Sequence, residues 1–456
     1  MLDIALLALN GVFASPAPVQ SEPTPPADAP VPSEVQQLRD RVAQLENKVS
    51  EMAAREGEQW LTEQRADEIR SVVQETLADA DARASLADSG ATAGWEKGKG
   101  FFISSADGNY LLKIGGQLQV RFVYNHQHDS PTDDNSEYGF EIRRAKLFFS
   151  GNLFDPTWTY QLEMSASNTS GTFSLGENAW FQKDLGGGFA LRAGQFKPWL
   201  LREESVTSKK LLGVERSIVN LAFSWGTAQG VQGGYQAEQW RAFLAVVDGA
   251  NTQNTGWSAL DNEFAGSARV EFLPFGSWKD VEDDDGWRGS EPALLFGLAG
   301  AFQRGETGSA ANGEIDSTTA TADATWKMNG FSLAGAFIYR NLDTAQTVAT
   351  PISANQFGVV VRGGIFLAED IELYASYEWG DLDTAGTPDL SIATIGITKF
   401  FDKHNIKWQT DIGYGFNPVG PAWNTPTSNL ASTGWRVDAP DEDGQIVIRS
   451  QFQLLF

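Results

Sequence analysis

Closely spaced charged side chains mark residues 197–226 of the 456-residue chain, KPWLLREESVTSKKLLGVERSIVNLAFSWG. Fixed cations at a narrow passage of low polarity replace part of the hydration that an anion loses there. The pattern therefore predicts anion binding. The alternative is that pairs such as Glu215 with Arg216, or Lys209 with Glu204, only hold the segment in place. The basic residues are Lys197, Arg202, Lys209, Lys210 and Arg216, and the acidic residues are Glu203, Glu204 and Glu215.

Nothing in the sequence favours catalysis. The chain has three histidines and no cysteine, so disulfides and thiolate chemistry are excluded. His126 and His128 could hold a metal ion, but beside Asp129 on a loop we interpret them as solvated. His404 lies in a short turn, and no histidine is paired convincingly with a serine. We expect no enzyme activity, no cofactor and no metal.

Composition excludes several other classes of protein. The formal net charge of −25 argues against a nucleic acid as partner. No run of 18 apolar residues is present in the body of the chain, which argues against a transmembrane helix there. The chain contains 46 Gly, 15 Trp, 9 Tyr and 28 Phe, a composition typical of short strands with many turns.

The first 88 residues differ from the rest. Residues 1–15 resemble the end of a secretory signal without its basic start, and residues 16–33 form a Pro-rich linker. Residues 34–88 are predicted to be a helical, periplasmic coiled coil, with a single amphipathic helix as the alternative. Its seam consists of Val35, Leu38, Val42, Leu45, Val49 and Met52.

From about residue 110 the apolar residues alternate with polar ones, as in strands with one apolar face. In TWTYQLEMSAS, for example, Trp158, Tyr160 and Leu162 share one face. The pattern predicts sixteen strands, near residues 111–124, 139–152, 156–167, 175–184, 188–196, 227–237, 240–248, 264–273, 292–303, 318–328, 331–341, 355–367, 370–379, 390–400, 405–416 and 444–456.

The connections between these strands sort by length, short after even-numbered strands and mostly long after odd-numbered ones. Such sorting is typical of an outer-membrane barrel. We therefore predict an all-β membrane protein, a 16-stranded antiparallel transmembrane β-barrel over residues 110–456. Residues 274–291, which contain VEDDDGW, are too long for the turn expected there. Strands in lipid must pair all their backbone groups, so the final strand, ending at Phe456, should close against the first.

Three motifs resemble the phosphate-selective porin O and P family over about residues 110–235. They are Arg143-Arg144-Ala145 with Gly151 downstream, Gly194-Gln195-Phe196-Lys197-Pro198, and Glu215-Arg216-Ser217. The resemblance implies a sixteen-stranded barrel, a homotrimer, and a third extracellular loop that folds inward.

Residues 197–226 are that third loop in our strand count. Its leucines would not remain in water, so we expect it to pack on the inner wall with its charges at the constriction. Arg121 and Arg192, on the lumen side of their strands, would extend this basic track. The dense basic ladder of the family's phosphate site has no match here, and acidic loops such as DSPTDDNSE would repel phosphate. We therefore predict a porin for small polar solutes with a mild preference for inorganic anions.

A structural role is the alternative. The N-terminal coiled coil could contact peptidoglycan or another envelope layer, with the barrel as its anchor in the outer membrane, among lipid and lipopolysaccharide. A tether of this kind should bind wall material without the barrel, whereas a porin should conduct without residues 1–95.

Overall fold

The computed structural model of the protein describes residues 34–56, 71, 74, 90–96, 100–128, 135–167, 170–257, 263–309, 313–344, 351–424, 429–439, 442 and 444–456. The chain divides into two units, residues 1–89 and 90–456. None of the helices in these ranges is both long enough and apolar enough to cross a membrane. The predicted signal remnant and Pro-rich linker lie outside the described residues.

Helix α2 (Glu34–Glu56) covers the predicted heptads in the first unit. Leu45, a seam residue, is 58% exposed. The coiled coil is not confirmed, because a single helix shows no partner packed on the seam. Most of the predicted helical stretch from 57 to 88 lies outside the described residues, so its pairing stays a prediction.

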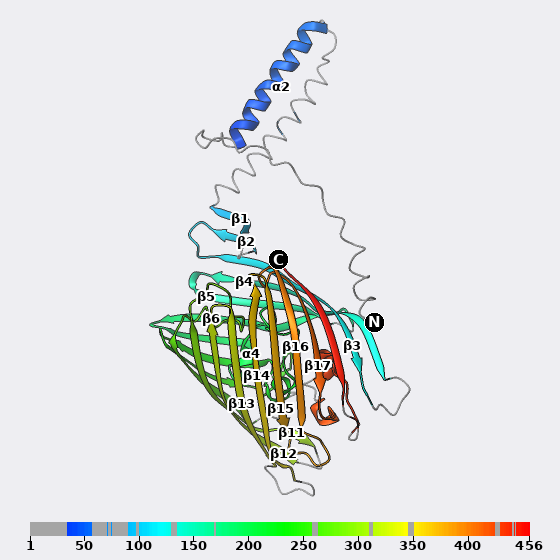
Figure 1. Ribbon diagram of the computed structural model, residues 1–456. Helices are drawn as coiled ribbons and strands as arrows, with labels where there is room; N and C mark the ends of the chain where they lie inside the picture. Colours follow the sequence, from blue (N-terminus) through cyan, green and yellow to red (C-terminus); the bar gives the residue numbers. More distant parts are fainter. Residues whose placement is uncertain are drawn as a thin grey trace. The chain divides into compact units, whose positions relative to one another are not determined.

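The second unit is built from β-strands (Figure 1). They are β1 (Ala91–Glu96), β2 (Gly100–Ser105), β3 (Leu111–His126), β4 (Ser136–Leu153), β5 (Asp155–Ala166), β6 (Phe173–Gly186), β7 (Phe189–Phe196), β8 (Ala228–Gln236), β9 (Trp240–Val247), β10 (Phe264–Phe275), β11 (Ala293–Ser309), β12 (Gly313–Met328), β13 (Phe331–Thr344), β14 (Ser353–Ala368), β15 (Ile371–Asp381), β16 (Leu390–Asp402), β17 (Ile406–Gly415) and β18 (Ile446–Leu455).

Strands β3 to β18 form a closed antiparallel barrel, which confirms the sixteen predicted strands. Each strand pairs with its neighbour in sequence, and β18 closes the ring against β3, from Ile446 opposite His126 to Leu455 opposite Gln117. The loop predicted at 304–317 is shorter than expected, because β11 and β12 continue pairing to Ser309 opposite Gly313.

Two further strands, β1 and β2, were not predicted. They form a hairpin, and β2 pairs with β3, with Phe101 opposite Ile114. The hairpin pairs with the same edge of β3 as β18 does, but nearer the start of β3. It therefore continues the sheet beyond the end of β18. Each strand has six residues, too short for alternation to distinguish a strand from a loop.

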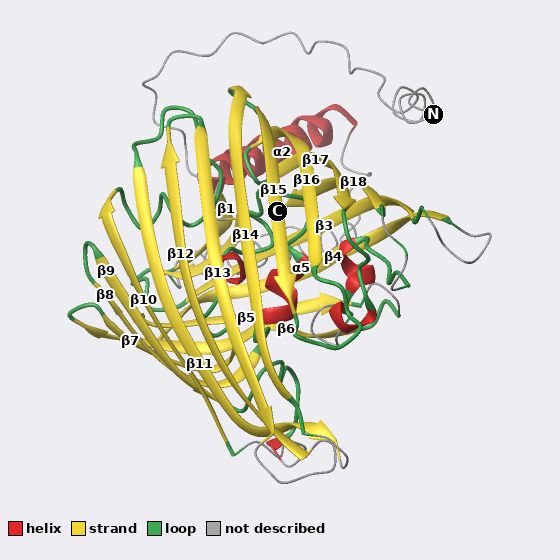
Figure 2. Ribbon diagram, turned by 60° about the horizontal axis from the view of Figure 1, so that its bottom comes forward, coloured by secondary structure: helices red, strands yellow, loops and turns green. Residues whose placement is uncertain are grey.

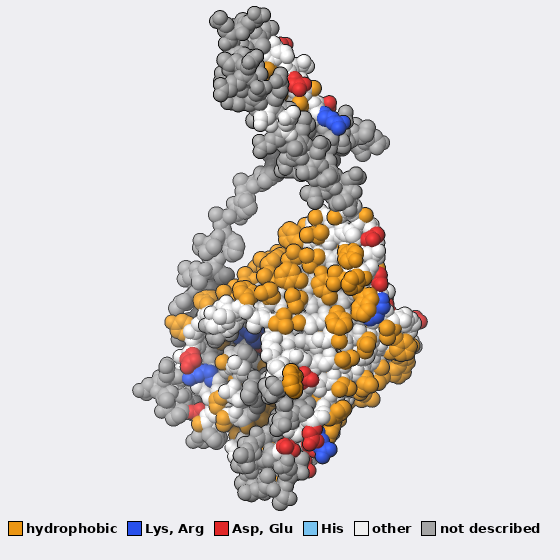
Figure 3. Space-filling view, turned by 180° about the vertical axis from the view of Figure 1, so that it is seen from behind, with side chains coloured by type: hydrophobic (Ala, Val, Ile, Leu, Met, Phe, Trp, Pro, Cys, Tyr) orange, Lys and Arg blue, Asp and Glu red, His pale blue; other side chains and the backbone are white. Residues whose placement is uncertain are grey.

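The barrel is apolar outside and polar inside. On β5, Leu162 is 41% exposed, whereas its neighbour Glu163 is 1% exposed. Hydrophobic side chains spread over the outer wall, as Figure 3 shows for one face. Aromatic pairs lie near both ends of the strands, such as Trp240 with Phe272 and Phe122 with Phe140. This arrangement suits an outer surface in hydrocarbon with aromatic girdles at its two borders.

Three connecting segments lie within the ring of strands. Segment 197–226, between β7 and β8, contains the short helices α4 (Arg202–Ser205) and α5 (Ile218–Phe223), and Figure 2 shows α5 inside the barrel. Residues 416–445, between β17 and β18, join it in one buried cluster that includes Val219, Phe223 and Trp423. The inward path of the described residues between β17 and β18 was not predicted from the sequence.

The third inward segment is 276–292, the connection that was too long for a simple turn. It enters from the end of the barrel where the other connections are short, the short-turn end. Val281 and Asp285 are each 1% exposed. The segment reaches β13 and β14, since Trp287 O accepts from Gly330 N and Arg288 donates to Phe366 O. The extra residues of this connection thus allow it to cross the barrel interior at the short-turn end.

The seam between β3 and β18 depends on a small residue. Gly116 N donates to Phe456 O at 2.7 Å, and the aromatic ring of Phe456 lies over Gly116. A Cβ atom at Gly116 would approach that ring to 2.2 Å. Replacing this glycine would therefore displace the last aromatic ring from the closing pair.

We expect Gly116→Val to destabilise the barrel by about 1–3 kcal/mol, because overpacking forces the ring and backbone to shift. The measurement is the temperature at which the folded, fast-migrating band unfolds in gel electrophoresis. Gly139→Val is the control, since a Cβ at Gly139 would meet no atom within 4 Å. Equal unfolding temperatures for the two variants would contradict this account of the seam.

Candidate functional site

Segment 197–226 is held inside the barrel by apolar packing and by helix capping. The Ser217 side chain accepts from Asn220 N and so caps the start of α5. Val219 is fully buried and lies against Gly358 of β14 and Gly380 of β15, whose missing side chains leave room for it. Because α5 lies close to the wall, the charged residues between α4 and α5 lie against the strands.

Glu215 is the centre of an ion-pair network with three arginines. Its carboxylate lies 2.7 Å from Arg143, 2.5 Å from Arg144 and 3.3 Å from Arg121. Burial raises the pKa of Glu215, but the three guanidinium groups outweigh burial and hold the pKa well below its ordinary value. The Glu215 carboxylate thus anchors segment 197–226 to β3 and β4 as an anion.

A second network surrounds Glu204. Lys197 forms an ion pair with Glu204 and another with Glu177 of β6 at 3.2 Å. Arg216 lies 3.4 Å from Glu204 and donates to the carbonyl of Val206 at 2.6 Å. Burial raises the pKa of Glu204, while Arg216 and Lys197 lower it below its ordinary value. Both cations are therefore compensated by carboxylates.

The inward segment from the short-turn end supplies partners for two more cations. Arg202 lies 3.5 Å from Asp284, and Lys210 lies 2.7 Å from Glu282. Asp284 also receives Arg362 of β14 at 2.6 Å. Acidic residues that were predicted to belong to a turn outside the barrel thus neutralise basic residues of segment 197–226.

Arg362 and Glu203 form a pair, 2.7 Å apart, at the border between the segment and the wall. The cavities between segment 197–226 and the strands include two that are both lined by Glu203 and Arg362. A solute or water molecule in these spaces would meet a compensated pair of charges.

Lys209 and Arg192 differ from the other predicted cations. Neither has a carboxylate within 4 Å among the residues that the structure describes. Lys209 lies over the ring of Phe148, and burial lowers its pKa to about 8. Arg192 stacks on Trp180 and donates to Gln182. Aromatic rings stabilise these two charges without cancelling them.

The predicted site residues differ in their partners. Most of them form ion pairs with carboxylates, whereas Lys209 and Arg192 lie on aromatic rings. Arg121 has no exposed surface, because Glu141, Glu215 and the Ser432 carbonyl surround it. In the sequence, Arg143 and Arg144 carried only the family resemblance and no assigned role. The inward parity of Arg144 on β4 could have identified it as a partner for the segment's acids, whereas Arg143 reaches Glu215 where the register between β3 and β4 shifts. For Asp284, the sequence offered only one indication of an inward position, the unexpected length of the connection 274–291.

A closed sixteen-stranded barrel with an apolar outer wall, charged interior and inward-folded segments defines a porin of the outer membrane. The family comparison agrees, since the model of the phosphate-selective porin O and P family matches residues 112–389, more than half of the chain. The chain belongs to this family. None of the curated proteins compared with the chain is significantly similar to it in sequence.

Solved structures share the fold. An anion-selective porin from Comamonas acidovorans matches with a TM-score of 0.53 and 13% identity, over 76% of this chain and 99% of that one. Salmonella typhi OmpF in complex with daunomycin matches at 0.52 and 15%, over 76% and 98%. The trimer form of OmpT from Vibrio cholerae matches at 0.50 and 14%, over 75% and 98%. At these identities the similarity establishes the barrel alone.

Removing the anion at the centre of the first network should be costly. We expect Glu215→Gln to destabilise the folded barrel by about 3–5 kcal/mol, because it leaves buried arginines without their shared partner. Thermal or denaturant unfolding of the purified protein measures the change. Glu282→Gln is the control: its side chain is 56% exposed, so losing its pair with Lys210 should cost less than about 1 kcal/mol. Equal losses would contradict the anchoring role of Glu215.

The lowered pKa of Lys209 predicts a pH-dependent charge inside the barrel. Lys209 is cationic below its pKa of about 8 and neutral above it. If ions pass this residue, the preference for anions over cations should decrease between about pH 7 and about pH 9. Zero-current potentials in a salt gradient measure this preference. Lys209→Met should lose the pH-dependent step, and Lys210→Met should keep it; a step retained in Lys209→Met would assign the titration to another group.

Proposed function

We propose that this protein is a passive diffusion channel for small hydrophilic solutes, with segment 197–226 forming the constriction and a mild preference for anions. The observation that carries the proposal is the position of Lys209, a cation on the inward segment without a carboxylate within 4 Å in the described part of the chain. Fixed positive charge of this kind attracts anions into a narrow aqueous passage.

The preference should be mild because the other cations of the segment are compensated. Lys197, Arg202, Lys210 and Arg216 each lie within 4 Å of a carboxylate. Paired charges produce only weak fields a few ångströms away, so they add little to the attraction of a passing anion. Inorganic anions, phosphate among them, are the solutes that this arrangement favours.

We infer that the assembly is a homotrimer. The similarity of the barrel to the trimer form of Vibrio cholerae OmpT supports this inference. The Comamonas acidovorans structure, an anion-selective porin, supports the proposed preference in the same way, through a shared fold.

The direct test is the zero-current potential of the purified protein in a planar bilayer under a KCl gradient. Wild type should give a potential of the sign for chloride preference. Lys209→Glu/Lys210→Glu should reverse that sign, because it replaces two positive charges of the segment with negative ones.

Lys183→Glu/Lys399→Glu is the matched control, with the same change of net charge. Lys183 and Lys399 lie at the short-turn end on the outer side of the wall, paired with Asp155 and Asp370. This variant should keep the wild-type sign. A cation-preferring potential in wild type, or equal shifts in the two double variants, would reject the assignment of the constriction to segment 197–226.

A further inference from the structure

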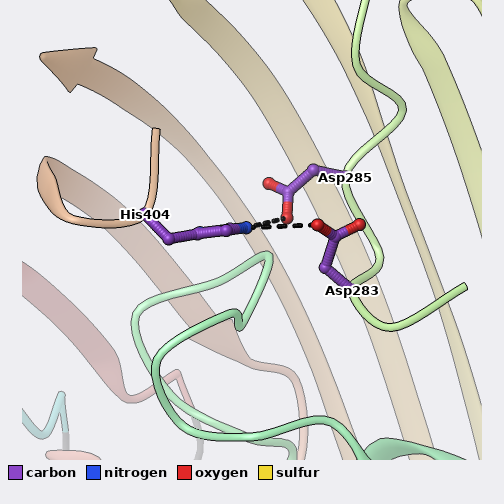
Figure 4. Close-up of side chains that lie close together, drawn as sticks. All are labelled: Asp283, Asp285 and His404. Carbon is purple, nitrogen blue, oxygen red and sulfur yellow. Dashed lines mark hydrogen bonds and ion pairs between the residues drawn. The ribbon is translucent and has the colours of Figure 1, made fainter. Parts of the chain in front are cut away.

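Asp283, Asp285 and His404 converge inside the short-turn end of the barrel. The two aspartates belong to the inward segment 276–292, and His404 belongs to the turn between β16 and β17. His404 Nε2 lies 3.4 Å from Asp283 Oδ2 and 3.3 Å from Asp285 Oδ2 (Figure 4). One potential ligand atom from each of the three residues lies within 4.8 Å of the other two.

Two buried carboxylates at this cluster, those of Asp285 and Glu372, lack hydrogen-bond donors among the described residues. Asp285 is 1% exposed, and neither of its carboxylate oxygens has a hydrogen-bond partner. Glu372 of β15 has no exposed surface, lies beside Asp285, and also has two oxygens without a partner. Isolated carboxylates are expensive to bury, and a cation bound between them would reduce that cost.

Nearby lysines satisfy only part of this charge. Lys327 Nζ lies 2.5 Å from Asp283 Oδ1 and therefore leaves Oδ2 facing His404. Lys407 Nζ donates to the carbonyl of Leu211 at 3.0 Å and forms no ion pair within 4 Å with the described carboxylates. Neither lysine forms an ion pair with Asp285, whose negative charge a bound cation would balance.

The spacing of the atoms fits a small metal ion. A tetrahedral ion with bonds of about 2.0–2.1 Å separates its ligand atoms by about 3.3–3.4 Å. The two distances from His404 Nε2 to the aspartate oxygens have these values. The imidazole is held in place by the edge-on rings of Trp287 and Phe400. Trp287 also donates to Asp283 Oδ2 at 3.1 Å, which orients that carboxylate.

We propose that Asp283, Asp285 and His404 bind one divalent transition-metal cation of the Zn²⁺ class. An imidazole nitrogen among carboxylates suits such ions, whereas Ca²⁺ and Mg²⁺ prefer oxygen ligands alone. The site lies in the folded barrel and does not depend on whether the barrel conducts anions.

A bound ion would join two parts of the barrel that are distant in sequence, because its ligands come from segment 276–292 and from the turn between β16 and β17. Between the two aspartate ligands lies Asp284, which pairs with Arg202 and Arg362. The metal would therefore hold the acidic segment against the basic residues of segment 197–226.

Isothermal titration of the full-length, detergent-purified protein with ZnCl₂, after treatment with a chelator, tests the site. Wild type should bind one Zn²⁺ per chain. His404→Gln should weaken this binding at least tenfold. The chain has three histidines, so His126→Gln/His128→Gln is the complete matched control and should bind as wild type does. Co²⁺ should give the visible absorption of a tetrahedral complex in wild type and lose it in His404→Gln.

Asp285→Asn provides a second variant if His404→Gln does not fold, and heat-modifiable gel migration establishes folding for each protein. Asp285→Asn should also weaken Zn²⁺ binding at least tenfold. Absence of Zn²⁺ binding to folded wild type, unchanged binding in the folded His404 or Asp285 variant, or loss of binding in the His126/His128 variant would overturn the proposal. Tighter binding of MgCl₂ or CaCl₂ than of ZnCl₂ would reject the transition-metal class. All of these titrations are independent of channel measurements.

Discussion

Backbone pairing around a closed ring is the constraint from which the rest of this structure follows. Hydrocarbon offers no hydrogen-bond partner, so the edge of β18 must be satisfied by β3, and it is, over ten residue pairs. In a closed ring, the alternation of residues along each strand determines whether a side chain points outward or inward. One face meets lipid, and the other meets a confined interior that polar and charged residues must fill.

The confined interior requires its charges to compensate one another. Arg269 of β10 illustrates this, since it lies fully buried between Glu271 of the same strand and Asp323 of β12. The same rule governs segment 197–226, which enters the barrel through apolar packing and carries its charges with it. Glu215 finds arginines on β3 and β4, and Arg202 finds Asp284 on a segment entering from the other end. Lys209 and Arg192 have no such carboxylate within 4 Å among the described residues, so their charges are not compensated in this way.

Segment 276–292 links the two ends of the barrel electrostatically. Its acidic residues face basic residues of segment 197–226 on one side, and the His404 turn on the other. A conformational change at either end would leave buried charges without partners, which is costly in a low-dielectric interior. Segments 197–226 and 276–292 are therefore coupled to each other through their ion pairs.

The sixteen strands of the ring, most of their boundaries to within a few residues, and the side chains that face lipid could all be predicted from the sequence. These properties depend on local alternation and turn length, which neighbouring residues encode. The sequence also identified the charged segment, because Lys209 and its neighbours are adjacent in the chain. Which charges of the described residues pair with one another depends on the three-dimensional fold. Asp283 and His404 are 121 residues apart, and Arg202 and Asp284 meet across the barrel interior. No local pattern specifies such partners, because they are brought together by ring closure and by the inward course of the connecting segments.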